Sequence, residues 1–390
     1  MAILLNNQTK IITFESETYS NFKLSNIIKM TLIKTSHIFR GVLPLAATLL
    51  IAFSAIAQDN QKLVREADKI HQKILSIDTH NDTALRINNP NSKPGALSPQ
   101  VTFQKMKDGG LDAAFFAIYV GQESRDSAGL AKATAFADDQ LRKFKSYTDN
   151  YKGAAIAYNS KDLLRNKREG KTSAVLAIEN GYVFQKNISL VKHFADMGVV
   201  AVTLCHNKNN DICDASMDTA PEHHGLSPFG VEVVKEMNRL KIIIDVSHAS
   251  TESLFDILEV STLPIIASHS GVWNIKNHNR NLKDNEIKAI AAKGGLIQVA
   301  TGRFFLSDKP KEEVTVSDIA NHIDYVVKLV GIDHVGIGTD FDGGGGVVGL
   351  EGADKMKNIT IELLKRGYSE EDIAKFWGKN LLTILHKHGK

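Results

Sequence analysis

The chain has 390 residues, with 47 Lys or Arg against 44 Asp or Glu, and its formal net charge is +3. The first 57 residues hold five of the basic and two of the acidic side chains, so the remaining 333 carry 42 of each. This balance does not favour a nucleic acid or an anionic membrane surface as a partner. A chain of this length can form one domain if it is a barrel.

The N-terminal segment has the pattern of an export signal. Residues 41–57 are uncharged and apolar, Lys34, His37 and Arg40 precede them, and Ala55-Ile56-Ala57 ends them. A basic region, an apolar region and a small-residue cleavage site, in that order, are typical of a secretory signal. The sequence therefore predicts an exported protein, either periplasmic or secreted.

Met30 is the start that this signal implies, which makes residues 30–57 the signal peptide and residues 1–29 an over-extended N-terminus. The alternative is an uncleaved membrane anchor, because the 17 apolar residues approach the length of about 20 that a spanning helix needs. A homodimer is also compatible with the sequence.

After residue 57, short β-rich runs alternate with longer amphipathic stretches, as in a chain of βα units. We predict strands over residues 74–77, 113–120, 174–178, 199–204, 242–246, 264–267, 296–300 and 335–338. We predict helices over residues 61–73, 128–150, 188–197, 228–240, 252–259, 316–330, 356–366 and 370–386. The pattern favours an α/β fold, a (β/α)8 TIM barrel with C-terminal helices, as a single domain over residues 58–390. An open doubly wound sheet is the alternative, but no glycine-rich phosphate turn follows the first strand.

Polar residues follow most of these strands. They are Asp78, His80 and Asp82 after the first strand, then Glu179, His206, His248, His269 and Asp340 after later ones. The carboxyl ends of all strands of a barrel meet on one face, so we expect these side chains to converge on one pocket. Because His, Asp and Glu are metal ligands rather than nucleophiles, the sequence predicts a metal-dependent hydrolase.

The spacing of these residues suggests two half-sites. His80 and Asp82 are two apart in an extended segment, so they point the same way and can bind one cation together. His248 and His269 each follow a Ser at the end of neighbouring strands and can form the other half. Glu179 lies between the two in barrel order, where it could bridge two metals or orient a ligand histidine. For any one of these residues alone, a structural role is the alternative.

Three further residues are candidates for catalysis and substrate binding. Asp340 ends the last strand beside the first and could hold a proton near the metals. His206 could hold the oxyanion, or it could be a structural histidine. Arg280 has the guanidinium fork that suits a substrate carboxylate, or it could be a solvated surface residue. The Gly343–Gly346 run could shape or gate the pocket, or form an ordinary loop.

The chain has two cysteines, Cys205 and Cys213. An exported chain could join them in one disulfide, and the alternative is a pair of small packed side chains. Two cysteines at this spacing make no zinc signature.

Together these motifs resemble the membrane (renal) dipeptidase family of zinc peptidases, within the metal-dependent hydrolase superfamily. The similarity covers roughly residues 65–385. Its anchors are Asp78–Asp82, Ile178-Glu179, Thr203–Asn207, Gly225–Gly230, Asp245–His248, Ser268–Ser270, Arg280-Asn281, Gly338–Gly343 and Asn380–Leu382.

The resemblance implies a dipeptidase with two Zn²⁺ ions. His80 and Asp82 would hold one ion, His248 and His269 the other, and Glu179 would bridge them. His206 would contact the substrate and its tetrahedral intermediate, Arg280 would bind the terminal carboxylate, and Asp340 would transfer the proton. A hydroxide bridging the metals would then attack the peptide bond of a dipeptide.

Two departures from the family pattern affect the substrate pocket. Family members usually have two glycines after the bridging Glu, and here Asn180 replaces the first. The stretch after His206 usually carries a Cys, a Pro and a Trp, whereas this chain has residues 207–213, NKNNDIC. A related amidohydrolase acting on another small amide, a D-aminoacyl compound or a lactone is therefore an alternative. A non-catalytic peptide-binding barrel is a further one.

Overall fold

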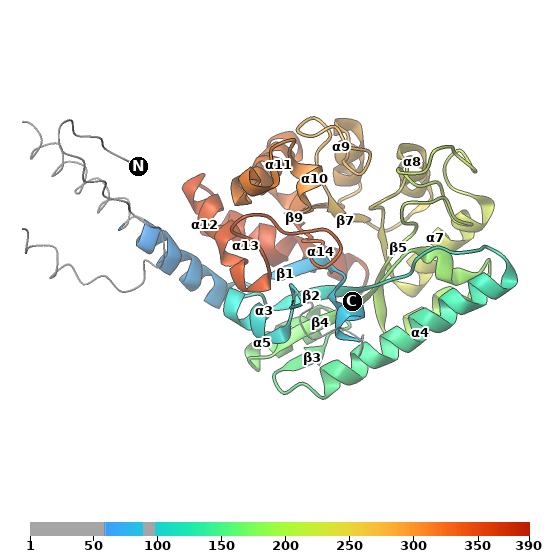
Figure 1. Cartoon of the computed structure of the whole chain (residues 1–390), viewed down its shortest axis with the longest axis horizontal. Coiled ribbons are helices and arrows are strands. Elements are labelled where there is room, and N and C mark those ends of the chain that lie inside the picture. Colours follow the sequence, from blue (N-terminus) through green and yellow to red (C-terminus); the bar gives the residue numbers. More distant parts are fainter. Residues whose placement is uncertain (1–57, 59, 89–97) are drawn as a thin grey trace, which may run out of the picture. The chain divides into compact units, whose positions relative to one another are not determined.

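The computed structural model describes residue 58, residues 60–88 and residues 98–390 (Figure 1). From Asn60 to Lys390 the chain forms one compact unit. The predicted over-extended N-terminus and signal peptide, residues 1–57, lie outside the described residues. Within the described part, every helix is too short or too polar to cross a membrane.

A parallel sheet curls into a nearly closed barrel at the centre of the fold (Figure 1). Its strands, in spatial order, are β1 (Ile77–Asn81), β2 (Ala113–Tyr119), β4 (Thr172–Glu179), β5 (Val199–Thr203), β6 (Ile243–Asp245), β7 (Ile266–Ser270), β8 (Leu296–Val299) and β9 (Val335–Ile337). The remaining strand, β3 (Ala154–Ile156), pairs with β4 outside this ring. The (β/α)8 prediction is confirmed.

The first and last strands of the barrel, β1 and β9, are joined at their carboxyl ends. The amide of Asp340 donates to the carbonyl of His80 at 2.9 Å, and the amide of Asp82 donates to the carbonyl of Phe341 at 2.9 Å. Hydrogen bonds therefore join the end of β1 to the loop after β9, and three of the predicted site residues lie at this junction.

Helices surround the barrel and cover the outer face of its strands. They are α2 (Thr83–Ile87), α3 (Phe103–Gly109), α4 (Ser127–Asp149), α5 (Ser160–Arg168), α6 (Ser189–Asp196), α7 (Pro228–Leu240), α8 (Thr251–Val260), α9 (Asp284–Ala292), α10 (Arg303–Leu306), α11 (Val316–Val330), α12 (Lys357–Lys365), α13 (Glu370–Ala374) and α14 (Asn380–Lys387). Residues 60–73 are also helical. The start of α7 follows the sequence signal, because Ser227 accepts the amide of Gly230 at 2.9 Å and Pro228 occupies the first turn.

The strands separate two apolar cores, because alternate residues face opposite sides. Ala114 and Phe116 of β2 pack with the surrounding helices. Ala113 and Phe115 pack inside the barrel, in a cluster that includes Leu381 and Leu385 of α14 together with the first residues of several strands. The C-terminal helix thus supports the end of the barrel interior opposite to the strands' carboxyl ends.

The predicted boundary of the first strand is wrong. We predicted a strand over residues 74–77, whereas β1 spans Ile77–Asn81. Polar residues can stay within this strand because the barrel supplies partners for them: Asp78 accepts the amide of Thr339 at 2.8 Å and its hydroxyl at 2.7 Å. The sequence interpretation also missed β3 and the helices α2, α3, α5, α9 and α10.

Cys205 and Cys213 are both buried as free thiols. Of the two alternatives, the described structure has the pair of packed small side chains.

Candidate metal centre

Glu179 lies at the centre of the site. As the last residue of β4 it shares the inward face of that strand with Ala177, so its side chain enters the barrel, where it is 3% exposed. Its Oε2 atom lies 3.8 Å from Nε2 of His80. Its Oε1 atom lies 3.1 Å from Nε2 of His248 and 3.6 Å from Nε2 of His269. The two oxygens of one carboxylate therefore face two separate groups of polar side chains.

His80 and Asp82 form the first group, at the end of β1. Nε2 of His80 lies 3.6 Å from Oδ2 of Asp82, and both side chains are almost fully buried. Nε2 of His80 and Oδ1 of Asp82 have no hydrogen-bond partner among the described residues. Buried polar atoms are rarely left without a partner, so this pair has the arrangement of a site that receives a cation.

His248 and His269 form the second group, at the ends of β6 and β7. Nδ1 of His248 donates to Oδ1 of Asn207 at 3.0 Å, and Nδ1 of His269 donates to Oγ of Ser268 at 2.8 Å. Each ring then carries its proton on Nδ1, which leaves the Nε2 lone pairs free. These two Nε2 atoms are 3.0 Å apart. Two lone pairs at that distance repel unless a cation lies beside both, so the group fits a metal.

A buried carboxylate beneath the second group fixes its orientation. Asp245 ends β6 and accepts the amides of Ser247 at 3.0 Å and Ser268 at 2.8 Å on Oδ1. Its Oδ2 accepts the hydroxyls of Ser268 and Thr203. The Ser268 hydroxyl donates its hydrogen to Asp245, so it cannot also donate to His269. The Nδ1 atom of His269 must therefore carry the proton in that hydrogen bond, and this determines the tautomer of the histidine.

The charges of the centre favour an added cation. Burial raises the pKa of Glu179 well above its usual range, and the nearby carboxylate of Asp82 raises it further. Burial alone lowers the pKa of His80, but Glu179 and Asp82 outweigh it and raise the value to about 10. Burial lowers the pKa values of His248 and His269 well below the usual range, and the next cause is Arg280 for His248 and His80 for His269. The second pair is therefore neutral, as metal ligation requires.

The donor atoms present fit a site for two metals. Three overlapping groups have their ligand atoms within 4.8 Å of one another: His80, Glu179 and His269; Glu179, His206 and His248; and His80, Asp82 and Asp340. Glu179 belongs to two of them. The set combines imidazole and carboxylate, which suits zinc and other divalent transition metals.

Asp340 lies beside the first group. Burial, and then Asp82, raise the pKa of its carboxyl to about 7. Its backbone φ is +58°, and its carbonyl accepts the amides of Gly343, Gly344 and Gly345 at 3.1, 3.0 and 2.7 Å. The glycine run therefore forms a hydrogen-bonded turn around Asp340. Its position agrees with the interpretation that the run shapes the pocket.

His206 follows β5 and lies above Glu179. Its Nε2 is 3.9 Å from Oε1 of Glu179, and its ring is 4.2 Å from the ring of His248. Burial, and then Arg280, lower the pKa of His206 to about 4, so the imidazole is neutral near pH 7. About a quarter of its side chain is exposed to the cavity. The ring of Tyr119, at the end of β2, also packs against His206, with 4.7 Å between the ring centroids.

Arg280 is buried at the wall of the same cavity. One guanidinium nitrogen, Nη2, donates to the carbonyl of His269 at 3.0 Å, and Nε has no hydrogen-bond partner among the described residues. The guanidinium lies 5.6 Å from the ring centroid of Phe305. A buried cation with a free donor suits an anionic ligand such as a carboxylate.

One cavity of about 490 Å³ lies at the carboxyl ends of the strands, and Asp82, Glu179, His206, His248, His269, Arg280 and Asp340 line it. His80 does not line this cavity, but its ligand atom lies within 4.8 Å of those of Glu179 and His269. The structure thus brings together every predicted site residue, from Asp82 near the first strand to Asp340 near the last. Sequence reasoning assigned no role to several residues that line or support the site, among them Tyr119, Asn207, Asp245, His278 and Phe305. Tyr119 ends a predicted strand and could have been found by the same rule, whereas Phe305 carries no local signal.

Comparisons with known proteins agree with this arrangement. The sequence matches the membrane dipeptidase family (peptidase family M19) over residues 64–389. It is 32% identical to dipeptidase tcpJ of Claviceps purpurea over 300 residues, which cover 75% of this chain and 70% of that protein. The fold is similar to the crystal structure of the probable dipeptidase PvdM from Pseudomonas aeruginosa, with a TM-score of 0.77 and 28% identity, covering 84% of this chain and 98% of that one.

A crystal structure described as the dipeptidase AC, a metallopeptidase of family M19, shares the fold with a TM-score of 0.73 at 23% identity, covering 81% of this chain and 98% of that one. Because the family match extends over most of the chain and includes every strand of the barrel, this chain belongs to the membrane dipeptidase family, peptidase family M19.

Proposed function

We propose that the chain hydrolyses the peptide bond of dipeptides at a centre of two zinc ions. His80 and Asp82 would hold one ion, His248 and His269 would hold the other, and Glu179 would contribute one carboxylate oxygen to each. The observation that carries this proposal is the orientation of the Glu179 carboxylate. Its Oε2 atom faces His80, and its Oε1 atom faces His248 and His269. Membership of the dipeptidase family supports the reaction and the need for a metal.

When bound, such a metal pair supplies an activated water and polarises the scissile carbonyl. Side chains of the protein bind the substrate, stabilise the developing charge and transfer the proton. The guanidinium of Arg280 binds the terminal carboxylate of the dipeptide and so places the peptide bond over Glu179. The N–H of the neutral His206 donates to the carbonyl oxygen as negative charge develops on it. The carboxylate of Asp340, with a pKa raised to about 7, takes the proton released by the attacking water and returns it to the leaving amine nitrogen.

The first test separates ligands from substrate-binding residues. Glu179→Ala should lose about one zinc per chain, because it removes the bridge of a two-metal site. His206→Ala should keep both zinc ions but lose about 100-fold or more in kcat, as expected for an oxyanion donor. Zinc content by plasma mass spectrometry and initial rates on Ala-Ala check both variants. Loss of zinc from His206→Ala would instead make that residue a ligand.

The same measurements test the reaction itself. The zinc-loaded enzyme should cleave dipeptides, and it should act poorly on tripeptides and C-terminal amides because these place no carboxylate at Arg280. Complete removal of metal with a chelator should abolish activity, and zinc should restore it. Activity that survives complete metal removal would contradict the proposed centre.

We also infer that the protein is exported and that residues 30–57 are removed. The support is the basic, apolar and small-residue order that ends at Ala55-Ile56-Ala57. N-terminal sequencing of the protein purified from its native host should give Gln58 as the first residue. A mature protein that retains residues 41–57 would be an anchored form.

A further inference from the structure

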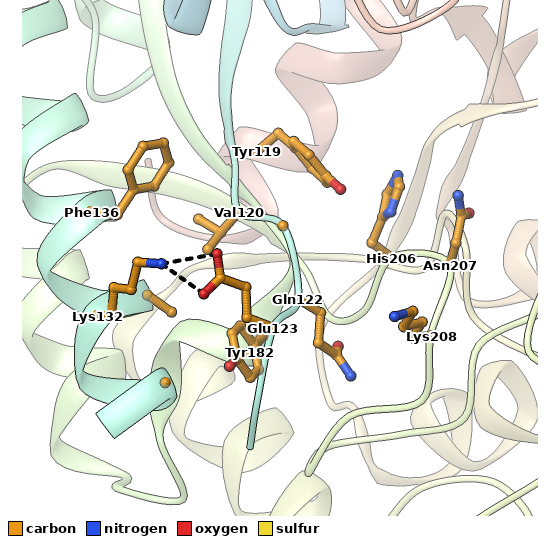
Figure 2. A pocket seen from close by; sticks show the side chains of 13 residues that line it. Tyr119, Val120, Gln122, Glu123, Lys132, Phe136, Tyr182, His206, Asn207 and Lys208 are labelled. Carbon is orange, nitrogen blue, oxygen red and sulfur yellow. Dashed lines mark hydrogen bonds and ion pairs between the residues drawn. The ribbon is translucent and has the colours of Figure 1, made fainter. Parts of the chain in front are cut away.

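A second chamber adjoins the catalytic cavity. It has a volume of about 480 Å³, in the range of small-molecule sites, and it shares Tyr119, His206 and Asn207 with the catalytic cavity. Figure 2 shows Phe136 on α4 across this space from Tyr119 and His206. Arg280 lines the catalytic cavity but not this chamber. The chamber therefore extends from the Tyr119–His206 side of the site, and the carboxylate-binding group lies elsewhere.

The inner wall of the chamber is apolar and largely aromatic. It consists of Tyr119, Val120, Ala133, Phe136 and Tyr182. Phe136 is 40% exposed and lines this chamber, so its ring is available for contact with a ligand there. Aromatic walls of this kind favour aromatic ligands through edge-to-face contacts.

The charged residues of the chamber are exposed or already paired. Lys132 lies 2.7 Å from Glu123, and their side chains are 70% and 62% exposed (Figure 2). Lys208 is also exposed. These charges therefore lie at the solvent side, and the buried wall offers apolar contact rather than an ionic partner.

Amide side chains brace the loops beside the chamber, and two of them, Asn180 and Asn210, lie where this chain departs from its family pattern. Asn180, with φ of +90°, donates to the carbonyl of Val120 at 2.9 Å and accepts from the side chain of Asn210 at 3.0 Å. Gln122 donates to the carbonyl of Asn209 at 2.6 Å. These bonds join the loop after β2 to the loops after β4 and β5, and the loops after β2 and β5 line one side of the chamber.

The chamber lies within reach of the reacting carbonyl. Tyr119 pairs in register with Glu179 on the next strand, at a spacing of about 4.8 Å. In a dipeptide whose carboxylate is bound at Arg280, the N-terminal residue extends away from the guanidinium. Its side chain leaves the carbon next to the scissile carbonyl, so it can enter a chamber that begins beside Tyr119.

We propose that this chamber binds the side chain of the N-terminal residue of the dipeptide and selects large apolar side chains, aromatic ones above all. The proposal rests on the dipeptidase function described above. It makes Phe136 a specificity-determining residue, although Phe136 touches neither the metal ligands nor the residues proposed for catalysis.

The experiment compares kcat/KM for Phe-Ala, Ala-Phe, Ala-Ala and Glu-Ala in three proteins: the wild type, Phe136→Ala and the control Phe255→Ala. Phe255 is 37% exposed on α8 and lines neither cavity. The wild type should prefer Phe-Ala to Ala-Ala. Phe136→Ala should lower kcat/KM for Phe-Ala by about tenfold and change Ala-Ala by less than about twofold, because only the larger side chain reaches the truncated part of this apolar wall. Phe255→Ala should match the wild type.

A binding measurement gives a second readout. In the zinc-loaded Asp340→Asn background, where proton transfer is blocked, calorimetry should show Phe136→Ala weakening Phe-Ala by the same factor while Ala-Ala is unaffected. A preference for Glu-Ala, or equal effects of Phe136→Ala on all four dipeptides, would overturn the chamber proposal while leaving the dipeptidase intact. Failure to cleave any dipeptide would instead overturn the proposed function, and this proposal with it.

Discussion

Gly343 shows how closely the backbone approaches the proposed metal centre. A Cβ atom at this position would lie 2.1 Å from Oδ2 of Asp82 and 2.3 Å from Oδ1 of Asp340. Both carboxylates would have to move. At Gly344, the nearest atom to such a Cβ is Oδ2 of Asp340 at 3.4 Å, an ordinary contact. The two adjacent glycines therefore form a matched pair for testing the geometry of the carboxylates.

We expect Gly343→Ala to lower zinc affinity and to reduce kcat/KM by at least about tenfold, because displaced carboxylates bind metal poorly. Gly344→Ala should stay within a few-fold of the wild type. Zinc titration and initial rates on one dipeptide check both variants. Equal zinc affinity and equal kcat/KM in the two variants would show that the close approach of Gly343 to Asp82 and Asp340 does not matter for function.

Individual site residues were predictable where the side chain itself carries the chemistry. Any one of His80, His248 and His269 could be structural, but three imidazoles at strand ends together indicate metal ligation. Asn207 and Phe305 carry no such indication, because an amide or an aromatic ring acquires its role only through a contact made in the folded chain, such as the 3.0 Å bond from His248 to Asn207.

At the level of elements, the ends of β6 and β7 act together through Asp245. This carboxylate accepts the hydroxyl of Ser268, which in turn accepts from His269. Replacing it by an amide places a donor where one of its oxygens now accepts. The relay that determines the tautomer of His269 should then fail, although the shape of the side chain is kept.

Asp245→Asn should therefore weaken zinc binding by about 10- to 100-fold. Competition against a chelator of known affinity measures this change without relying on activity. Asp256→Asn is the control, since Asp256 accepts the amide of Leu226 at 2.9 Å and lies outside the centre. Unchanged zinc affinity in Asp245→Asn, with only a loss of folding stability, would limit Asp245 to a structural role.

The sequence predicted most elements but not all of their limits. α7 and α11 match their predicted ranges, because Ser227 and Thr315 cap them and their apolar periodicity is regular. The start of β1 was misplaced because Asp78 and His80 interrupt the apolar pattern although they lie within the strand. β3 has three residues and pairs only with β4, so it is too short for its alternation to be recognised.

For the whole molecule, a buried histidine links stability to pH. His322 of α11 accepts the amide of Val272 on Nδ1 at 2.9 Å and donates to the carbonyl of Leu306 at 3.1 Å. Burial lowers its pKa from 6.5 to about 4. Between these values the unfolded chain binds a proton that the folded chain rejects, so stability is complete above about pH 6.5 and falls as the pH is lowered towards 4.

Through His322 alone, the free energy of unfolding should be lower by about 2 kcal/mol at pH 5. Urea unfolding at pH 7.5 and pH 5 should therefore show a smaller pH-dependent loss in His322→Gln than in the wild type, by about that amount. The exposed His386 of α14 offers the control variant His386→Gln, which should keep the wild-type dependence. Identical pH dependence in all three proteins would contradict a neutral, buried His322.

The architecture as a whole followed from the alternation of strands and helices, and so did the convergence of side chains from Asp82 to Asp340. What the sequence did not reveal was the space between elements. The second chamber lies between α4 and the loops after β2 and β5, and the hydrogen bonds of Asn180, Asn210 and Gln122 that join these loops form only in the folded chain.

The hydrogen-bonded junction between β1 and the loop after β9 has a consequence for the order of folding. Its two hydrogen bonds join Asp340 to His80 and Asp82 to Phe341, residues made near the beginning and near the end of translation. A nascent chain therefore contains its first ligands long before it contains the residue proposed to carry the proton. The end of β1 gains these hydrogen bonds only when the loop after β9 is in place, so the proposed centre can be completed only after the C-terminal part of the barrel has folded.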